Sequence, residues 1–399
     1  MRIELGVDSQ GRSVAFDLDT LIRTRLLLQA SSGGGKSWTT RRILEQSHGK
    51  VQHLVFDPEG EFSTLREKFD YVLVGKGGEA AADPRTMPLL IRRVMELGVS
   101  AIIDLYEMPI PQRRVCVKVA LDALVNLPKE LWHPCVVVVD EGHEFAPEAG
   151  KGGRDVTSLE AMTGLTSRGR KRQFCAVFAT QRIGKMSKDA TAELRNRLIG
   201  LAVEDIDRKR AGEELGLVTK EDQRRLRELE PGQFYAIGPA LRVGGRPARE
   251  LVLVTIGAVQ TREPQVGTRA APPPPPREKV LAILSKLADL PKEAAEEAQT
   301  VAGLRRQVHE QRQEIARLRA GAPQMKTVQT IEKVKRVEVP VLTGKDAQYL
   351  QRTAQEISKS LEPMTKEIAD LGELLRGFQR EIVRARSQPV LPDAKRRSR

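Results

Sequence analysis

Residues 30–37, Ala-Ser-Ser-Gly-Gly-Gly-Lys-Ser, have the composition of a loop that binds phosphate groups. The phosphate-loop pattern is Gly-x-x-x-x-Gly-Lys-Ser/Thr; Ala30 replaces its first glycine, whereas Gly35, Lys36 and Ser37 fit. Glycines let consecutive backbone N–H groups face an anion, and a following helix adds its positive end. We therefore predict a nucleoside triphosphate here, with Lys36 on the β/γ-phosphates and Ser37 on Mg²⁺.

The flanks of this loop support the prediction. An apolar, strand-like run precedes it, and Lys36–Gln46 has helical composition. A flexible Gly/Ser linker is the alternative, and neither flank is typical of one. The residues expected to contact ATP are Ser32, Gly33, Gly34, Gly35, Lys36, Ser37 and Trp38.

A second candidate site lies in "CVVVVDEGHEFAP", residues 135–147, where an apolar run ends in two acids. An apolar strand would deliver both to one edge of a sheet. In loop-type ATPases the first acid steadies Mg²⁺, so we assign this role to Asp140. The adjacent acid, Glu141, is expected to polarise the attacking water. The alternative is an ordinary turn or helix start.

Two further segments add polar groups after apolar runs. "FCAVFATQR", residues 174–182, places Gln181 where it could sense the γ-phosphate or orient water. "VFDPEGEF", residues 55–62, places Asp57, Glu59 and Glu61 after a strand, either as outer acids around the metal and water or as a polar turn. These two interpretations of the acids stay open.

Arginines in "SRGRKRQ", residues 167–173, are candidates for contact with a neighbouring subunit's γ-phosphate. Arg168 and Arg170 are the first candidates, and Arg195 and Arg197 the second. A solvated helix end explains the same residues equally well. His143 is expected at a helix start rather than at a metal, because the scattered histidines and unpaired cysteines give no zinc site.

Alternation of short apolar runs with helical segments predicts a doubly wound α/β domain with a mostly parallel sheet. A small antiparallel appendage is expected from "QFYAIG", "PALRVGG" and "ELVLVTI". The expected strands are Arg23–Ala30, Val51–Asp57, Tyr71–Val74, Val99–Tyr106, Cys135–Asp140, Phe174–Thr180 and Leu198–Val203.

Beyond this domain the composition changes. A proline-rich stretch predicts a semi-rigid linker, and apolar residues with heptad spacing then predict coiled-coil helices. The expected divisions are an ATPase domain at 1–258, a linker at 259–278, a helical segment at 279–322, a short β-like connector at 323–345, a second coiled-coil helix at 346–388 and a basic tail at 389–399.

Composition limits the class of protein. The formal charge is +13, of which residues 259–399 carry +9, and such a surplus suits an anionic partner. Three cysteines (Cys116, Cys135 and Cys175) without C-x-x-C spacing are expected to be buried thiols of a cytoplasmic protein. No apolar stretch approaches the roughly 18 residues that span a membrane.

Taken in order, these motifs resemble the HerA/FtsK superfamily of RecA-like hexameric motor ATPases, and the HerA type most. "VFDPEGEF" is similar to that family's Asp-Pro-x-Gly-Glu motif, and "VVVVDEGHEFAP" to its Asp-Glu-Ala-His-x-Phe-x-Pro motif. The resemblance covers roughly residues 3–257. It implies a RecA-like P-loop domain, a homo-oligomeric and hexameric ring with active sites between subunits, and double-stranded DNA in a basic pore.

The chain departs from the family pattern at Ala30, at Gly142 in place of an alanine, and at Ile183 in place of a proline. Only about twenty residues precede the first expected strand, so we expect the family's N-terminal β-barrel to be missing. This makes a nuclease-bound role doubtful.

Two hypotheses follow. The first is an ATP-hydrolysing ring that translocates double-stranded DNA and uses ATP and Mg²⁺. The second is a nucleotide-switched scaffold that organises a protein partner through residues 279–399. The presence of both Glu141 and Gln181 favours the first, because a scaffold needs no hydrolytic set.

Overall fold

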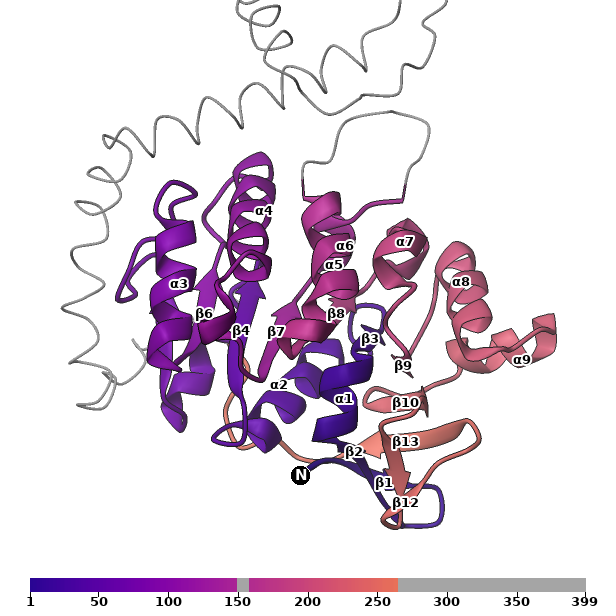
Figure 1. Ribbon diagram of the computed structural model, residues 1–399. Helices are drawn as coiled ribbons and strands as arrows, with labels where there is room; N and C mark the ends of the chain where they lie inside the picture. The colour runs from indigo at the N-terminus through magenta and orange to yellow at the C-terminus, as the bar shows by residue number, and fades with distance from the viewer. Residues whose placement is uncertain (149–157, 265–399) are drawn as a thin grey trace, which may run out of the picture. The chain divides into compact units, whose positions relative to one another are not determined.

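The computed structural model describes residues 1–148 and 158–264. Within these residues, 13 strands form one sheet in the order β12-β11-β2-β1-β13-β10-β9-β3-β8-β7-β4-β6-β5 (Figure 1). The predicted helical segments 279–322 and 346–388, the connector 323–345, the basic tail 389–399 and linker residues 265–278 lie outside the described residues.

Half of the sheet is parallel. Its neighbouring strands pair in parallel register. Each of the seven overlaps a strand that the sequence predicted. These strands are β9 (Asn196–Ile199), β3 (Leu26–Gln29), β8 (Phe174–Thr180), β7 (Cys135–Val139), β4 (Gln52–Asp57), β6 (Ser100–Asp104) and β5 (Tyr71–Val74). The α/β class and the parallel core are thus confirmed.

The other half is antiparallel and continues the same sheet, so the sheet as a whole is mixed. β10 pairs with β9, which joins the expected appendage directly to the parallel core. The strands are β10 (Gln233–Ile237), β13 (Val252–Ile256), β1 (Arg2–Asp8), β2 (Ser13–Asp17), β11 (Leu241–Val243) and β12 (Arg246–Pro247). The expectation of a mostly parallel sheet with a small antiparallel appendage was wrong in its proportions, because β1 and β2 enlarge the antiparallel half.

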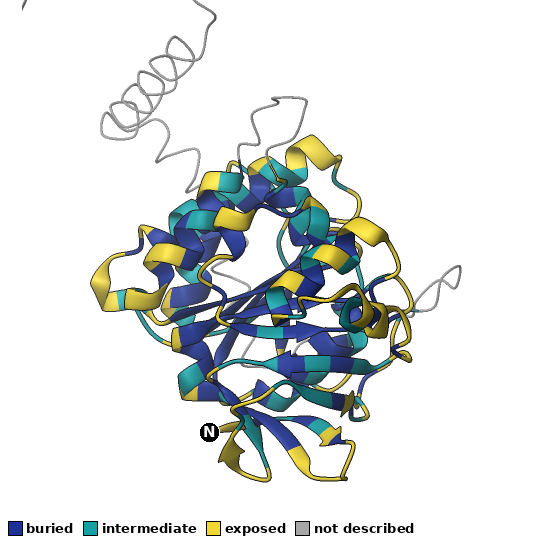
Figure 2. Ribbon diagram, turned by 90° about the vertical axis from the view of Figure 1, so that its right-hand side faces the viewer, coloured by how far each residue is buried: buried dark blue, intermediate teal, exposed yellow. Residues whose placement is uncertain are grey.

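Both faces of the sheet are covered by helices, and a hydrophobic core lies on each side. One core takes Ile43 and Leu44 from α2 together with residues of α1, and the other takes Leu90 and Val94 from α3. Figure 2 shows buried strands between helices with exposed outer sides. On one face lie α1 (Leu18–Thr24), α2 (Lys36–Ser47) and the 3₁₀ helix η1 (Ser63–Glu67).

On the second face, α3 shows how apolar residues at helical spacing form the buried side of a helix. In α3 the buried residues Met87, Leu90 and Val94 follow one another at steps of three and four, and Gly98 ends the helix in the left-handed region. The other elements on this face are α4 (Ile110–Val125), α5 (Gly142–Phe145), α6 (Leu159–Arg168), α7 (Lys188–Thr191) and α8 (Asp205–Leu215).

Short elements complete the connections. They are η2 (Lys129–Leu131), η3 (Gly169–Arg172), η4 (Ile183–Lys185), α9 (Lys220–Arg224) and η5 (Arg225–Arg227). Along the described part of the chain, no helix combines the length and apolar character needed to cross a bilayer.

Five of the seven predicted strands have different bounds in the structure: β4 and β7 are one residue shorter, and β3, β6 and β9 differ by more. Arg23–Arg25 do not belong to β3, because Asp17 accepts the N–H of Thr20 and so caps α1, which runs to Thr24. β9 lies at Asn196–Ile199 instead of Leu198–Val203, and β6 is shorter than predicted at both ends. Tyr71–Val74 and Phe174–Thr180 are strands with the predicted bounds.

Candidate active site

The loop between β3 and α2 has the backbone that its glycines predicted. Gly33 and Gly35 have φ of 76° and 91°, in the left-handed region that favours glycine, and Gly35 caps α2. A Cβ at Gly35 would lie 3.0 Å from the backbone nitrogen of Gly232, which itself donates to the Gly34 carbonyl at 3.1 Å. The loop therefore packs against the segment that leads into β10.

The residues that depart from the family pattern fit their surroundings. Ala30 is buried. A Cβ added at Gly34 would lie 3.0 Å from the Ala30 methyl group, and a Cβ added at Gly200 would lie 3.1 Å from it. The larger side chain of Ala30 is accommodated because both neighbours are glycines. A Cβ on Gly142 would come within 2.9 Å of the Met186 methyl group, so an alanine here would require that side chain to shift.

Lys36 lies between the two acids that follow β7. Its Nζ donates to Asp140 Oδ1 and lies 3.1 Å from Glu141 Oε1, and all three side chains are at least 95% buried. Burial lowers the pKa of Lys36, but the Asp140 and Glu141 carboxylates outweigh it and raise the pKa above its ordinary value. Lys36 is therefore charged in this arrangement.

The two acids differ in environment. Burial raises the pKa of Asp140 to about 6, although the positive charge of Lys36 acts to lower it. The negative charge of the neighbouring Glu141 adds to the rise. Burial also raises the pKa of Glu141, but the hydrogen bond from His143 and the charge of Lys36 lower it to about 2. The environment thus separates the two carboxylates, which is typical of acids with different tasks.

Glu141 has an unusual backbone conformation, and its carboxylate contacts Gln181 and His143. Its φ of 47° is unusual for a non-glycine residue, and backbone strain of this kind is common at active sites. Gln181 Nε2 donates to Glu141 Oε1 at 2.7 Å, and His143 Nδ1 lies 3.2 Å from Oε2 and 3.0 Å from Thr180 Oγ1. The structure thus brings Lys36, Asp140, Glu141 and Gln181 together.

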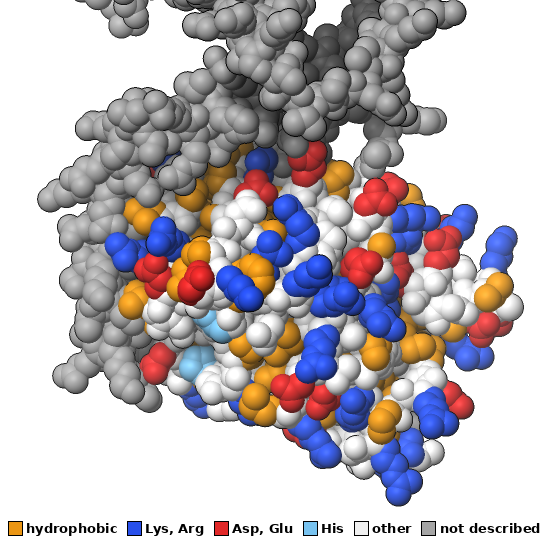
Figure 3. Space-filling view, viewed as in Figure 1, with side chains coloured by type: hydrophobic (Ala, Val, Ile, Leu, Met, Phe, Trp, Pro, Cys, Tyr) orange, Lys and Arg blue, Asp and Glu red, His pale blue; other side chains and the backbone are white. Residues whose placement is uncertain are grey.

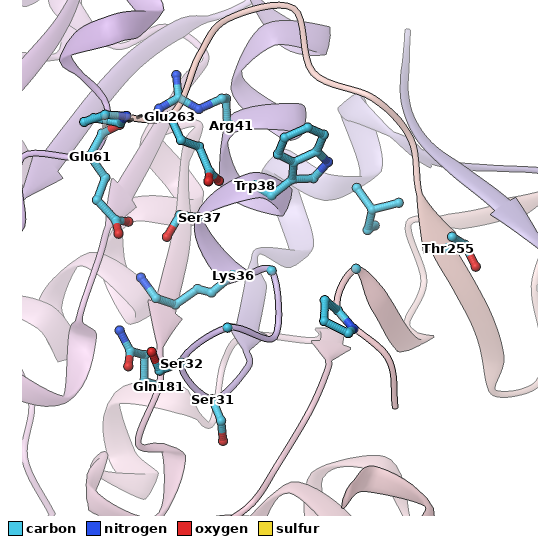
Figure 4. A pocket seen from close by; sticks show the side chains of 16 residues that line it. Ser31, Ser32, Lys36, Ser37, Trp38, Arg41, Glu61, Gln181, Thr255 and Glu263 are labelled. Atoms are coloured by element: carbon cyan, nitrogen blue, oxygen red, sulfur yellow. Dashed lines mark hydrogen bonds between the residues drawn. The ribbon is translucent and has the colours of Figure 1, made fainter. Parts of the chain in front are cut away.

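A cavity of about 610 Å³ opens beside these residues (Figure 4). That volume is within the usual range for a small-molecule site. One wall is the phosphate loop, including Ser32, Gly33, Ser37 and Trp38. The remaining lining comes from Arg41, Glu61, Gln181, Pro231, Gly232, Thr255, Ile256, Glu263 and Pro264.

Several of these lining residues were not singled out by the sequence. Arg41 and Glu263 belong to no motif, and Pro231 reaches the loop only because β10 and β13 join the sheet. The contact of His143 with Glu141 was also missed, although His143 was expected at the start of the short helix where it lies.

The donor set fits Mg²⁺. Asp140 Oδ2 and Glu61 Oε2 are buried without a hydrogen-bond partner. Ser37 and Glu61 line the cavity, and Asp140 bonds Lys36, which lines it too. Mg²⁺ prefers oxygen ligands and usually binds through one or two carboxylates together with phosphates and waters. In residues 1–148 and 158–264 no group of three or more His, Cys, Asp or Glu could hold a metal alone, so phosphate oxygens would have to complete the site.

The three acids of "VFDPEGEF" have different surroundings. Asp57 is buried and accepts the N–H groups of Glu61 and Phe62 at 3.1 and 2.8 Å, so it holds the turn. Glu59 is 44% exposed and lies 3.7 Å from Arg113. Of the three, Glu61 lines the cavity.

Arg168 and Arg170 lie near the amino end of β8, whereas Gln181 follows its carboxyl end. The seven residues of β8 span roughly 20 Å, so neither arginine reaches the site of its own subunit. Both are exposed, and Arg170 lines a second cavity with Arg23 and Arg195. Figure 3 shows Lys and Arg side chains gathered on this face between α6 and α1.

The three cysteines are buried and form no disulfide, as predicted. Burial raises the pKa of the Cys116 and Cys175 thiols to about 12, so neither is reactive at neutral pH.

Comparison with solved structures found several similar chains. VirB4 of Thermoanaerobacter pseudethanolicus is 15% identical, with 64% of this chain and 96% of that chain covered and a TM-score of 0.47. The genome packaging NTPase B204 of Sulfolobus turreted icosahedral virus 2, solved with ATP-gammaS, is 11% identical, with 57% and 99% covered and a TM-score of 0.38. The bacterial conjugative coupling protein TrwBdeltaN70 is 12% identical, with 66% and 90% covered and a TM-score of 0.45.

A search of curated proteins gave no match. Residues 3–125, from β1 to the end of α4, match the family model of the central domain of helicase HerA. This segment contains the phosphate loop and the Asp-Pro-Glu-Gly-Glu turn. The resemblance to the HerA type that the motifs indicated is therefore confirmed over residues 3–125.

Proposed function

We propose that this chain is a Mg²⁺-dependent ATPase that assembles as a homo-oligomeric, hexameric ring and translocates double-stranded DNA. The observation that carries the proposal is the convergence of Lys36, Asp140, Glu141 and Gln181 at one end of the cavity. Two observations support DNA as the partner. Residues 3–125 match the helicase HerA model, and Lys and Arg side chains gather on the surface between α6 and α1.

Nucleotide binding changes the partners of Lys36. Without nucleotide its ammonium group neutralises Asp140 and Glu141. When it turns to the phosphates, Asp140 needs another cation, and Mg²⁺ supplies that charge and polarises the phosphate oxygens when bound. Glu141 keeps its contacts with Gln181 and His143 when Lys36 turns away, and its carboxylate can then take a proton from the attacking water.

Glu141→Gln tests this assignment. The substitution keeps the size of the side chain and removes the group that takes the proton from water. We expect ATP turnover to fall by about 100-fold, a typical value for the loss of a general base. Nucleotide affinity, measured with a fluorescent ATP analogue, should stay close to that of the unsubstituted protein. Normal turnover in the variant would contradict the role of Glu141.

A further inference from the structure

Glu61 has an unused carboxylate oxygen in the nucleotide cavity. Its Oε2 is buried and has no hydrogen-bond partner. In Figure 4 the carboxylate points into the cavity beside Ser37 and toward Lys36. The charge of Glu61 also raises the pKa values of both Lys36 and Asp140, so it lies close enough to act on the same site.

The backbone of Glu61 is held from two sides. Asp57 accepts its N–H at 3.1 Å, and Arg41 Nη2 donates to its carbonyl oxygen. Arg41 is fully buried, and its guanidinium carbon lies 5.9 Å from the centre of the Phe62 ring. Because Arg41 follows Ser37 by one helical turn, the two side chains point from the same face of α2. The backbone of Glu61, from which the carboxylate extends, is thus fixed relative to the phosphate loop.

Arg41 is in turn held by the strap, which we define as residues 257–264 after β13. Thr261 Oγ1 accepts from Arg41 Nη1 at 2.8 Å and donates to Glu45 Oε1 at 2.7 Å. The N–H groups of Gln260 and Thr261 donate to the two oxygens of Glu45 at 2.7 and 2.9 Å. Thr261 and Glu45 are 4% and 5% exposed, so the strap is built into the domain at this point.

The strap also borders the cavity directly. Glu263 and Pro264 line it, and Trp38 Nε1 donates to the Gly257 carbonyl at 3.0 Å. The strap covers part of the stretch that the sequence assigned to a linker from residue 259. In the described part of that stretch, residues 259–264, the chain contacts α2 and η1.

We propose that Glu61 is a carboxylate of the Mg²⁺–nucleotide site, where it accepts hydrogen bonds from water on the cation, and that Arg41 and Thr261 position it. This rests on the proposed function. Mg²⁺ keeps several waters when it binds nucleotide, and these waters need acceptors. Asp57 is occupied by backbone N–H groups and Glu59 faces Arg113, so Glu61 is the acid of this turn with a buried oxygen free for that purpose.

Glu61→Gln tests the direct contact. Binding of a fluorescent ATP analogue is titrated with Mg²⁺ on the full chain. We expect the apparent Mg²⁺ affinity to fall by about 10-fold or more, as for other groups that hold a metal's outer ligands. Nucleotide affinity without Mg²⁺ should be unchanged or higher, because a negative charge near the phosphates is lost. The variant is expected to fold, since it removes a buried charge without breaking a described bond.

Glu59→Gln is the matched control. It makes the same chemical change two residues earlier in the same turn, on a side chain that is 44% exposed and faces Arg113. Its Mg²⁺ titration should match that of the unsubstituted protein. An equal loss in both variants would show a general charge effect and would overturn the assignment of Glu61.

Thr261→Val tests the positioning. The side chain keeps its shape but loses the hydroxyl that accepts from Arg41. We expect a smaller loss of Mg²⁺ affinity than with Glu61→Gln, and no further loss when the two are combined. Thr64→Val is the control, because the Thr64 hydroxyl donates to the Arg262 carbonyl on the same strap without contacting Arg41. Equal effects of both threonine variants would contradict the positioning role.

The outcomes separate this inference from the proposed function. If the unsubstituted protein binds nucleotide with Mg²⁺ and Glu61→Gln does not change the titration, the inference about Glu61 is wrong and the ATPase proposal stands. If the unsubstituted protein binds no nucleotide, the proposed function itself is wrong.

Discussion

Lys36→Ala is expected to lower nucleotide affinity by about 100-fold or more. The ammonium group is placed to bond the β/γ-phosphates, and hydrogen bonds between charged groups contribute about 1.5–3 kcal/mol each. Two such bonds lost correspond to at least about 100-fold in affinity. The measurement is equilibrium binding of a fluorescent ATP analogue in the presence of Mg²⁺.

This variant needs a control for folding, because Lys36 is the cation between two buried acids. Its removal leaves Asp140 and Glu141 without their neutralising charge, and breaking a buried pair in this way costs about 3–5 kcal/mol. Thermal unfolding therefore accompanies the binding assay. The double variant Lys36→Ala/Asp140→Asn also removes the negative charge of Asp140. It should recover part of the stability but none of the nucleotide binding. Normal nucleotide affinity in either variant would contradict the phosphate-loop assignment.

Substitution of the arginine that contacts a neighbour's γ-phosphate is expected to lower turnover by about 10³-fold while nucleotide binding stays intact. Arg168→Ala and Arg170→Ala are the two variants to test. Both residues are exposed near the amino end of β8, and the active site of the same subunit lies beyond its carboxyl end. Any action on the γ-phosphate must therefore take place between subunits.

A mixing experiment tests action between subunits. Either arginine variant has an intact Glu141, whereas Glu141→Gln subunits have intact arginines. In mixed rings a Glu141→Gln neighbour should supply the missing arginine and restore hydrolysis. Lys171→Ala is the matched control, since Lys171 is another exposed cation in the short helix that contains Arg170. Unchanged turnover in both arginine variants would remove Arg168 and Arg170 as candidates.

The residues at the centre of the site could be predicted from the sequence because their signals are local. The glycines and Lys36 lie within eight residues, and Asp140 and Gln181 each follow an apolar strand. Because parallel strands end at a common edge of the sheet, such residues meet without further information. Their roles remain predictions until variants are measured.

The walls of the cavity could not be predicted in the same way, because they depend on pairings between distant segments. β1 and β2 precede the first predicted strand, although Ile3 and Leu5 alternate with exposed or half-exposed residues as expected for a strand with one buried face. The pairing of β1 with β13 brings the strap to α2, where Thr261 contacts Glu45, a residue 216 positions earlier in the chain. No periodicity in the sequence indicates that contact.

The same limit explains the uncertainty about the acids of the Asp-Pro-Glu-Gly-Glu turn. Their spacing is equally consistent with a polar turn and with a metal site. The structure gives these acids different surroundings: Asp57 accepts backbone N–H groups of the turn, whereas Glu61 lines the cavity and its carbonyl oxygen accepts from Arg41.

ATP turnover with and without linear double-stranded DNA, measured across a salt series with Glu141→Gln as the blank, tests the central proposal most directly. A DNA motor predicts strong stimulation by DNA that fades as salt rises, since phosphate contacts release counterions. Turnover that is indifferent to DNA at low salt would contradict the motor, and would favour a nucleotide-switched scaffold that binds a protein partner through residues 279–399.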